Sequence, residues 1–320
     1  MSVWADNISN IFPASVSSLK LRFFGATIDD AYYTLPYLTE ATAKLSAYVE
    51  DDNYKRPGIA YGHTLQIMAT TMATPSSYLI RKLQDMKRVH VKAVLDSGNT
   101  ISTGLIASHS LDTAMGVHWE YSNTDSPDKP QKITFTFEMA VTNAEALLMV
   151  NGTPPADGTP DAGDIAYGLL ALPIHYSRGC GITLVELAAT GGAYTDIFST
   201  VEGTSFTARS VSDRTDHRNR ATPISVDVTV SAELEQAGTS EVDNALVINQ
   251  RRNDLRITLM NLNPATSAKM IVTLGANVGC TFDPIRSEGG TEKKAVIPLT
   301  ARGNMTLANW TACWPGDIIA

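Results

Sequence analysis

The sequence predicts a mainly β protein in which one β-rich domain, with one short helix, occurs twice in tandem. The chain has 320 residues, enough for two cores of about 150 residues each. It is 43% hydrophobic and 18% charged, as expected for an ordered, soluble chain. Short segments rich in Val, Ile, Thr and Phe alternate apolar and polar residues, which favours strands over helices. Similar segments return in the same order in the second half.

The first strand of each half establishes the spacing of the repeat. Residues 19–27 (LKLRFFGAT) match residues 182–190 (ITLVELAAT), at an offset of 163 positions. Four residues later, Ala31-Tyr32 matches Ala193-Tyr194 at an offset of 162. Residues 38–42 then match residues 201–204 more loosely.

A strand, a charged loop and a second strand follow in both halves. Strands are expected at residues 43–49 and 206–211, followed by the loops 50–57 and 213–220. Each loop leads into an alternating strand, at residues 63–70 and 224–232. In the latter, Ile224, Val226, Val228 and Val230 share one face, and Ser225, Asp227 and Thr229 share the other, as in a half-buried strand.

Each half then offers one helix and three more strands. Residues 78–87 and 240–250 have apolar side chains at helical spacing, with serine near the start as an N-cap. The expected strands follow as matched pairs: 90–94 with 255–259, 103–108 with 269–274, and 132–137 with 294–299. The order of elements agrees at offsets of about 162 to 166, while residue identity between the halves is low.

A linker separates the two halves. Residues 151–164 are dense in Pro, Gly and Asp, which neither pack well nor continue a strand ladder. The predicted organisation is therefore a first domain at 1–150, this linker, and a second domain at 165–320.

No catalytic motif is present, so we expect neither an enzyme nor a cofactor. The chain lacks a phosphate-binding glycine loop, a nucleophile elbow and a zinc-protease helix. His109 and His118 share a region with Asp112 and Glu120, but nothing in their spacing singles out a metal site. The cysteines at 180, 280 and 313 form no Cys-x-x-Cys pair and are interpreted as buried thiols.

The charge pattern favours protein–protein docking over nucleic-acid binding. The net charge is −8, whereas a protein that grips duplex DNA needs a concentrated basic surface. The two loops mix both signs, as docking patches do. The candidate docking residues are Asp51, Asp52, Lys55, Arg56, Asp213, Arg214, Asp216, Arg218 and Arg220.

No segment reads as a membrane span or a signal peptide. The longest strongly apolar window, residues 165–174, is about half of what a bilayer crossing needs. Residues 1–12 lack the basic start of a secretory signal. We therefore expect no membrane insertion and assembly in the cytoplasm.

The element order resembles the tail tube domain of bacteriophages and related contractile injection machines. The resemblance covers most of the chain twice and rests on two strands, a long charged loop, an alternating strand, a helix and further strands. In that family each domain is a β-sandwich flanked by a helix, and hairpins of neighbouring domains join into one barrel around a channel. The loops at 50–57 and 213–220 match the family's stacking loop in position.

The resemblance implies a virion structural protein of the tail. A chain with two fused tube domains implies rings of three chains that act as six domains and stack head to tail into a tube. DNA would pass through transiently and without specific binding. The implied partners are further copies of the chain and other tail proteins, such as the tape measure, terminator and baseplate proteins.

Other functions fit two β domains as well. A baseplate hub or distal tail protein would form a single ring, and a capsid or decoration protein would also be structural. A two-domain carbohydrate-binding module is the alternative from a different class. It would require exposed aromatic clusters, whereas the tryptophans at 4, 119, 310 and 314 are spread along the chain.

Overall fold

The protein is mainly β, with antiparallel strands and one short helix among the residues that the computed structural model describes. These residues are 13–24, 32–35, 38–48, 62–72, 83, 86–103, 114–124, 132–142, 145, 149, 182–189, 193–196, 201–235, 253–259, 270–274, 280–282, 286–287 and 295–313. The first-half strands are β1 (Ala14–Phe24), β2 (Tyr33–Thr34), β3 (Leu38–Tyr48), β4 (Gly62–Met72), β5 (Arg88–Leu95), β6 (Thr100–Ser102), β7 (Gly116–Thr124) and β8 (Lys132–Val141). The second-half elements are β9 (Ile182–Ala189), β10 (Thr195–Asp196), β11 (Val201–Asp213), β12 (Thr222–Glu235), β13 (Asn253–Leu259), β14 (Met270–Leu274), β15 (Cys280–Phe282), β16 (Arg286–Ser287), β17 (Ala295–Thr306) and helix α5 (Leu307–Ala312).

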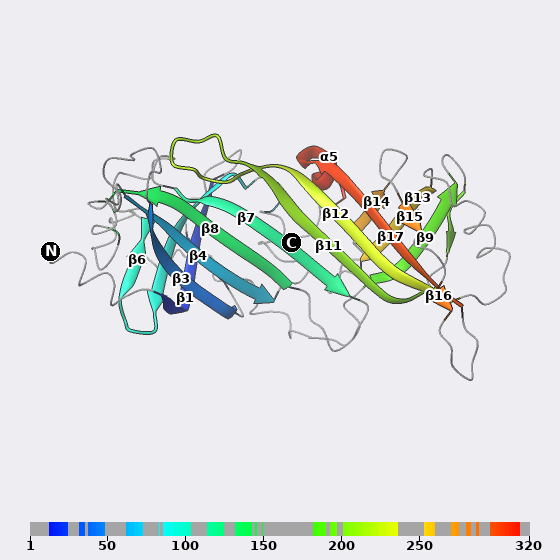
Figure 1. The fold of residues 1–320 in the computed structure, drawn as a ribbon, viewed down its shortest axis with the longest axis horizontal. Helices are drawn as coiled ribbons and strands as arrows, with labels where there is room; N and C mark the ends of the chain where they lie inside the picture. Colours follow the sequence, from blue (N-terminus) through cyan, green and yellow to red (C-terminus); the bar gives the residue numbers. More distant parts are fainter. Residues whose placement is uncertain are drawn as a thin grey trace.

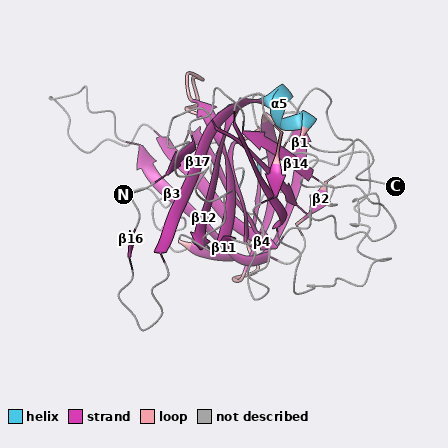
Figure 2. Cartoon of the chain, turned by 90° about the vertical axis from the view of Figure 1, so that its right-hand side faces the viewer, coloured by secondary structure: helices cyan, strands magenta, loops and turns pink. Residues whose placement is uncertain are grey.

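One large sheet runs through both halves of the chain. Its strand order is β15-β17-β12-β11-β7-β8-β4-β3-β1-β5-β6. Two further short strands join it: β2 pairs with β1, and β16 pairs with β17. The long strands lie side by side and run obliquely across the molecule (Figure 1). A smaller sheet has the order β10-β9-β13-β14. Viewed from one end, the strands curve, and α5 lies at the margin (Figure 2), where it contacts β17 and β12.

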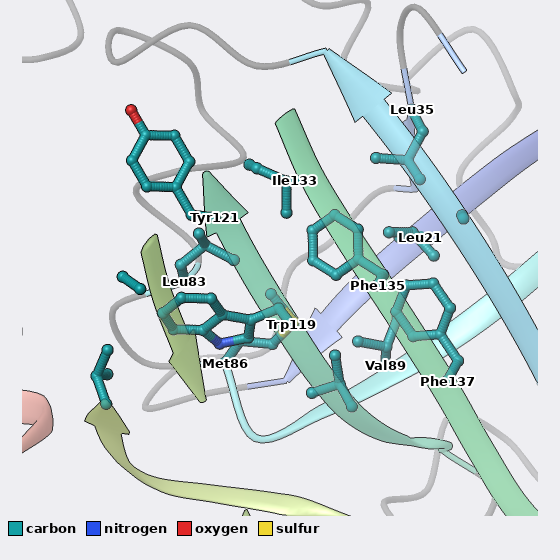
Figure 3. Close-up of a cluster of buried hydrophobic side chains, with 14 of the residues drawn as sticks. Leu21, Leu35, Leu83, Met86, Val89, Trp119, Tyr121, Ile133, Phe135 and Phe137 are labelled. Carbon is teal, nitrogen blue, oxygen red and sulfur yellow. The ribbon is translucent and has the colours of Figure 1, made fainter. Parts of the chain in front are cut away.

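Strand alternation supplies the core. In β8, the side chains of Ile133, Phe135, Phe137 and Met139 are buried, and the polar residues between them face the other way. Phe135 and Phe137 stack with their ring centroids 5.4 Å apart. The core side chains of β8 and β7 face Leu21 of β1 and Val89 of β5 (Figure 3). The first-half core therefore lies between the large sheet's middle strands and the β1–β5 pair.

Most predicted strands are confirmed. The segments expected at 19–27, 43–49, 63–70, 90–94 and 132–137 correspond to β1, β3, β4, β5 and β8. Those at 182–190, 206–211, 224–232, 255–259, 269–274 and 294–299 correspond to β9, β11, β12, β13, β14 and β17. β17 continues to Thr306, beyond the predicted end, because its second part pairs with β12 as far as Ser225↔Thr306.

Two local expectations about strands need correction. Ile224 does not share the buried face of Val226: it is 55% exposed, because a register shift in the β11–β12 pairing leaves it outside the ladder. The strand expected from Thr103 does not begin there, since β6 ends at Ser102, and residues 104–108 lie outside the described residues.

The two predicted helices lie largely or wholly outside the described residues. Within 78–87, Leu83, Met86 and Lys87 are described: Leu83 lies in a turn and Met86 and Lys87 are not helical, so the predicted helix does not extend to residue 87, although Leu83 and Met86 are buried. The segment 240–250 is not among them. The helix that the structure describes, α5, was not predicted: Thr306 accepts a hydrogen bond from the backbone N–H of Asn309 over 3.2 Å and caps it.

Candidate functional site

The charged loop between β11 and β12 joins the two halves of the chain. We call residues 213–222 the loop clasp. The loop extends beyond its own hairpin to the end of β8 (Figure 1). The predicted docking residues Asp213, Arg214, Asp216, Arg218 and Arg220 all belong to it. The other candidates, Asp51, Asp52, Lys55 and Arg56, lie outside the described residues.

Short side chains fix the shape of the loop clasp. Asp213 accepts hydrogen bonds from the backbone N–H of Thr215 over 3.0 Å and from its hydroxyl over 2.9 Å. Asp216 Oδ1 accepts a hydrogen bond from the backbone N–H of Arg218 over 2.8 Å. Asn219 adopts a left-handed conformation with φ of 52°, which asparagine tolerates better than most residues. The Asp-x-Thr and Asp-x-Arg spacings therefore fold the loop locally.

A buried ion pair lies at the centre of the loop clasp. Arg220 is 4% exposed and donates two hydrogen bonds to the Asp216 carboxylate, over 2.9 and 2.8 Å. Arg220 Nη1 also donates to the carbonyl of Ala114 over 2.9 Å. Arg88 of β5 lies 3.6 Å from the same carboxylate. The Arg220 hydrogen bonds hold the pKa of Asp216 well below its ordinary value.

The loop clasp binds the first half through both backbone and charge. Ala140 donates its N–H to the carbonyl of Arg218, and Val117 donates its N–H to that of Ala221, each over 3.0 Å. Arg218 pairs with Glu145 over 2.8 Å, and Arg214 pairs with Glu138 of β8. The second-half hairpin is therefore fastened onto β7 and β8.

Gly116 leaves the space in which the loop clasp sits. A Cβ atom at this position would lie 2.3 Å from the backbone nitrogen of Ala221 and 2.8 Å from its carbonyl oxygen. Such distances are far inside van der Waals contact, and the backbone cannot rotate away as a side chain can. A glycine is therefore needed at the first residue of β7.

We expect Asp216→Asn to lower the free energy of unfolding by about 3 kcal/mol, because it removes the carboxylate charge that pairs with the buried Arg220. Urea unfolding followed by tryptophan fluorescence measures the change. Asp213→Asn is the matched control: its carboxylate is exposed and, within the described part of the chain, accepts hydrogen bonds only from Thr215, so we expect a loss of about 1 kcal/mol or less. Equal losses in the two variants would contradict the central role of the Asp216–Arg220 pair.

The two halves also meet along a strand seam. β7 pairs with β11 from Ser205↔Thr124 to Arg209↔Glu120. One residue further, Ser210 Oγ accepts a hydrogen bond from the N–H of Trp119 over 2.9 Å and lies 2.9 Å from His118 Nδ1. Burial lowers the pKa of His118; the charges of Arg214 and Arg209 act in the same direction, and Glu120 opposes them.

His118 at the strand seam predicts how the stability of the protein depends on pH. The pKa of His118 is lower in the folded chain than in the unfolded chain, where it is about 6.5. When the pH falls below that value, the unfolded chain therefore binds more protons than the folded chain. Stability is therefore expected to fall as the pH drops through that value. Urea unfolding between about pH 7.5 and about pH 5.5 should show a steeper loss for the unmodified chain than for His118→Gln. Parallel pH profiles for the two proteins would contradict a contribution from His118.

The face of the large sheet opposite the core is polar. One row crosses seven strands, and neighbours in it are paired residues: Glu40, Thr70, Thr134, Glu120, Arg209, Asp227 and Asn304. Within it, the hydroxyls of Thr70 and Thr134 lie 3.2 Å apart, and Asn304 donates to Asp227 over 2.7 Å. Serine and threonine are the commonest residues at the other positions on this face, and Met68, which is 45% exposed, is an apolar exception.

The charges on this polar face balance. Among its described side chains we count four acidic and four basic ones, leaving out Glu138, which pairs with Arg214. They are Glu40, Lys44, Glu120, Lys132, Arg209, Asp227, Glu233 and Arg302. The described part of this face can therefore form many hydrogen bonds, and these eight side chains carry no net charge among themselves.

Two places in the large sheet have backbone edges that are unpaired among the described residues: the β15–β16 end and most of β3. Among the described residues, β3 pairs, apart from β4, only with the start of β1, at Ala14↔Ala43 and Ser15↔Thr42. β15 and β16 pair only with β17, among the residues that the structure describes. Unpaired strand edges are ready-made sites for strand addition.

Other chemistry finds little support in the described part of the chain. It contains no group of three or more histidine, cysteine or acidic side chains that could hold a metal ion. Of the predicted buried thiols, Cys313 is half-buried, and burial raises the pKa of its thiol to about 11. No helix among the described residues is long and apolar enough to cross a bilayer. Neither a scan against protein-family models nor a search of curated proteins found a match to the chain.

Proposed function

We propose that the chain is a phage tail tube subunit with two fused tube domains, and that three chains close into a ring of six similar domains. The observation that carries the proposal is the head-to-tail junction of the two halves within one sheet.

The strand orders support a tandem duplication. In the large sheet, the first half contributes β3-β4-β8-β7 and the second contributes β11-β12-β17-β15, in the same direction along the sheet. The remaining strands follow the orders β2-β1-β5-β6 and β10-β9-β13-β14. Eight strands of each half can thus be matched in sequence order and in most pairings, which supports the duplication; the β1–β3 pairing has no counterpart between β9 and β11 among the described residues, and β16 has none in the first half.

The pairing register supports the duplication independently. Ala43 pairs with Ile67, and Phe206 pairs with Val230, so both partners are shifted by 163 positions. Tyr32 and Tyr194, matched in the sequence, each lie beneath a cation. Lys92 Nζ is 4.1 Å from the first ring centroid, and Arg256 Cζ is 4.0 Å from the second.

The strand pairing between the two halves supports a way in which separate chains would pair with each other. The last strand of the first four-stranded unit, β7, pairs with the first strand of the second unit, β11. The equivalent edges left unpaired are those of β15–β16 and β3. Repeating the same junction between chains is a head-to-tail contact that closes into a ring if the rotation permits. The first residues of β1 pair with two residues of β3. They would have to move before the whole length of β3 could pair with the next chain.

The polar face suits the wall of a DNA channel. In a barrel closed this way the core lies outside, so the hydroxyl-rich face lines the lumen. Its balanced charges give phosphates neither a basic patch to bind nor a strong barrier to pass. Mobility of DNA would then come from weak, interchangeable hydrogen bonds rather than from the acidic net charge of the whole chain.

The contacts that the loop clasp makes within the chain determine the role that we propose for the docking residues. Arg214, Asp216, Arg218 and Arg220 are engaged within the chain, on the neighbouring half. We therefore assign the loops to lateral docking between adjacent domains of one ring. The loop that carries Asp51, Asp52, Lys55 and Arg56 would then dock onto the next chain of the ring.

Negative-stain microscopy of the purified protein tests this function. We expect hollow tubes of uniform width that lengthen as the concentration rises. Discrete rings that never stack would favour the baseplate hub, and a monodisperse monomer at high concentration would contradict the proposal. The carbohydrate-binding alternative is less well supported, because Trp119 and Trp310 are fully buried and offer no sugar platform.

A further inference from the structure

The start of β1 covers one part of the β3 edge. Ala14 pairs with Ala43, and Ser15 pairs with Thr42. We call residues 13–15 the strap. Pro13 has no backbone N–H to donate to a neighbouring strand, and among the described residues the pairing stops after Ala14. The strap is therefore held on β3 by two residue pairs.

The strap lies on β3 in the way that the end of β7 lies on β11. At the junction between the halves, Asn123 pairs with Phe206, and Thr124 pairs with Ser205. Subtracting the repeat offset of 163 from the two β11 residues gives the two β3 residues that the strap occupies. Both pairings are antiparallel, and in both the residue numbers rise on one strand while they fall on the other. The strap thus matches the end of β7 in position, direction and register.

The rest of this β3 edge offers a starting place for another strand. The β7–β11 pairing continues beyond Phe206 for three more residues, to Arg209. The corresponding β3 residues are Lys44, Leu45 and Ser46, and on this edge they have no strand partner among the described residues. A strand that first pairs here and then extends over all five positions replaces the two pairs of the strap with a longer pairing.

The strap can leave β3 without disturbing the core. Ser15 is exposed and Ala14 is half-buried, so their release uncovers little apolar surface. Val16, the next residue, is 6% exposed and belongs to the core. The pairing of β1 with β5 shifts register between Val16 and Ser18, directly after the strap. This irregularity separates the strap from the part of β1 that stays paired with β5.

We infer that the strap is a displaceable guard of the β3 edge, which gives way to a strand from a second copy of the chain during assembly. The inference rests on the proposed function, because it concerns the edge at which the chains of a ring would meet. A covered edge is protected from unspecific pairing. In the free chain the strap therefore limits assembly, and ring formation requires an exchange of strands.

A reversible disulfide between the strap and β3 tests the inference. The Ser15 carbonyl accepts a hydrogen bond from the N–H of Asp96 over 3.0 Å and so faces away from β3. Ser15↔Thr42 is therefore a non-hydrogen-bonded pair, whose Cα atoms lie about 4.5 Å apart, within the range that a disulfide spans. Both side chains are exposed. Ser15→Cys combined with Thr42→Cys thus places two thiols where oxidation can lock the strap.

We expect the oxidised double variant to need a concentration about tenfold higher or more for assembly, because the incoming strand cannot displace a locked strap. Dithiothreitol added to the same sample should restore assembly to within about twofold of the unmodified protein, which also shows that the variant is folded. Sedimentation velocity and negative-stain microscopy across a concentration series give the readouts, and mass spectrometry confirms the disulfide.

Two controls accompany the locked strap. Thr70→Cys combined with Thr134→Cys joins β4 to β8 on the same face, where the two hydroxyls lie 3.2 Å apart, and should assemble equally well when oxidised and when reduced. The single variants Ser15→Cys and Thr42→Cys, oxidised in the same way, show any effect of the cysteines that the chain already contains.

The outcomes separate this inference from the proposed function. If the unmodified chain forms tubes and the oxidised double variant forms them equally well, the inference is overturned and the tube remains. A disulfide that does not form would contradict the pairing of the strap with β3. If the unmodified chain never assembles, both the inference and the proposed function fail.

Discussion

Gly116→Val is expected to release the loop clasp and to lower the free energy of unfolding by about 3 kcal/mol, the upper end of overpacking costs. The reason is geometric. The first added carbon would lie 2.3 Å from the backbone nitrogen of Ala221, so either β7 or the loop must move. Moving the loop breaks the hydrogen bond from Val117 to Ala221 and separates Arg220 from Ala114.

Two measurements follow the release of the clasp. Urea unfolding gives the stability, and limited trypsin digestion reports on the loop, which offers cleavage after Arg214, Arg218 and Arg220. We expect cleavage there to be at least tenfold faster in Gly116→Val, because a released loop is open to the protease. Ser122→Thr, which adds one carbon on the polar face of the same strand, is the control and should change neither readout. A clasp that stays resistant to trypsin in Gly116→Val would contradict the close packing at this position.

Trp310→Ala is expected to cost about 3–5 kcal/mol of stability, the usual range for removing a buried tryptophan. Trp310 of α5 is fully buried, and its ring centroid lies 5.7 Å from that of Trp119 in β7. The contact joins the last described element of the second half to the centre of the first-half core. Losing it leaves a cavity beside the seam between the halves.

The comparison for this variant comes from the same helix. Asn309→Ala changes an exposed neighbour and should stay within about 0.5 kcal/mol of the unmodified protein. Unfolding in urea, followed by far-ultraviolet circular dichroism, avoids dependence on the tryptophan that has been removed. A cost below about 1 kcal/mol for Trp310→Ala would show that α5 does not fasten the halves together.

Local pattern predicted the strands because alternation is decided within a few residues. The apolar positions of residues 132–137 and 224–232 became the buried faces of β8 and β12, with Ile224 as the exception. A bulge shifts that residue out of the ladder, and bulges arise from pairing rather than from sequence alternation. β7 was missed although Val117, Trp119 and Tyr121 alternate with polar residues, so its signal was available in the sequence.

The contacts between the two halves could not be predicted from patterns in the sequence. The charges of the loop clasp were visible, but their partners lie far away in the sequence: Arg218 meets Glu145, and Arg88 meets Asp216. The short strands β2, β10, β15 and β16 carry too few residues for any periodicity. α5 has only six residues and follows directly on a strand that contains Gly303, so propensity alone did not separate the two elements.

The central claim is that three chains supply six similar domains to one ring. Cryo-electron microscopy of the assembled protein, viewed along the tube axis and refined without imposed symmetry, tests it most directly. We predict a closed ring of three-fold symmetry with six similar lobes. In it, the β7–β11 seam within a chain alternates with a β3 to β15–β16 seam between chains. A ring built from six chains, or an assembly in which β3 and β15–β16 stay unpaired, would contradict the account.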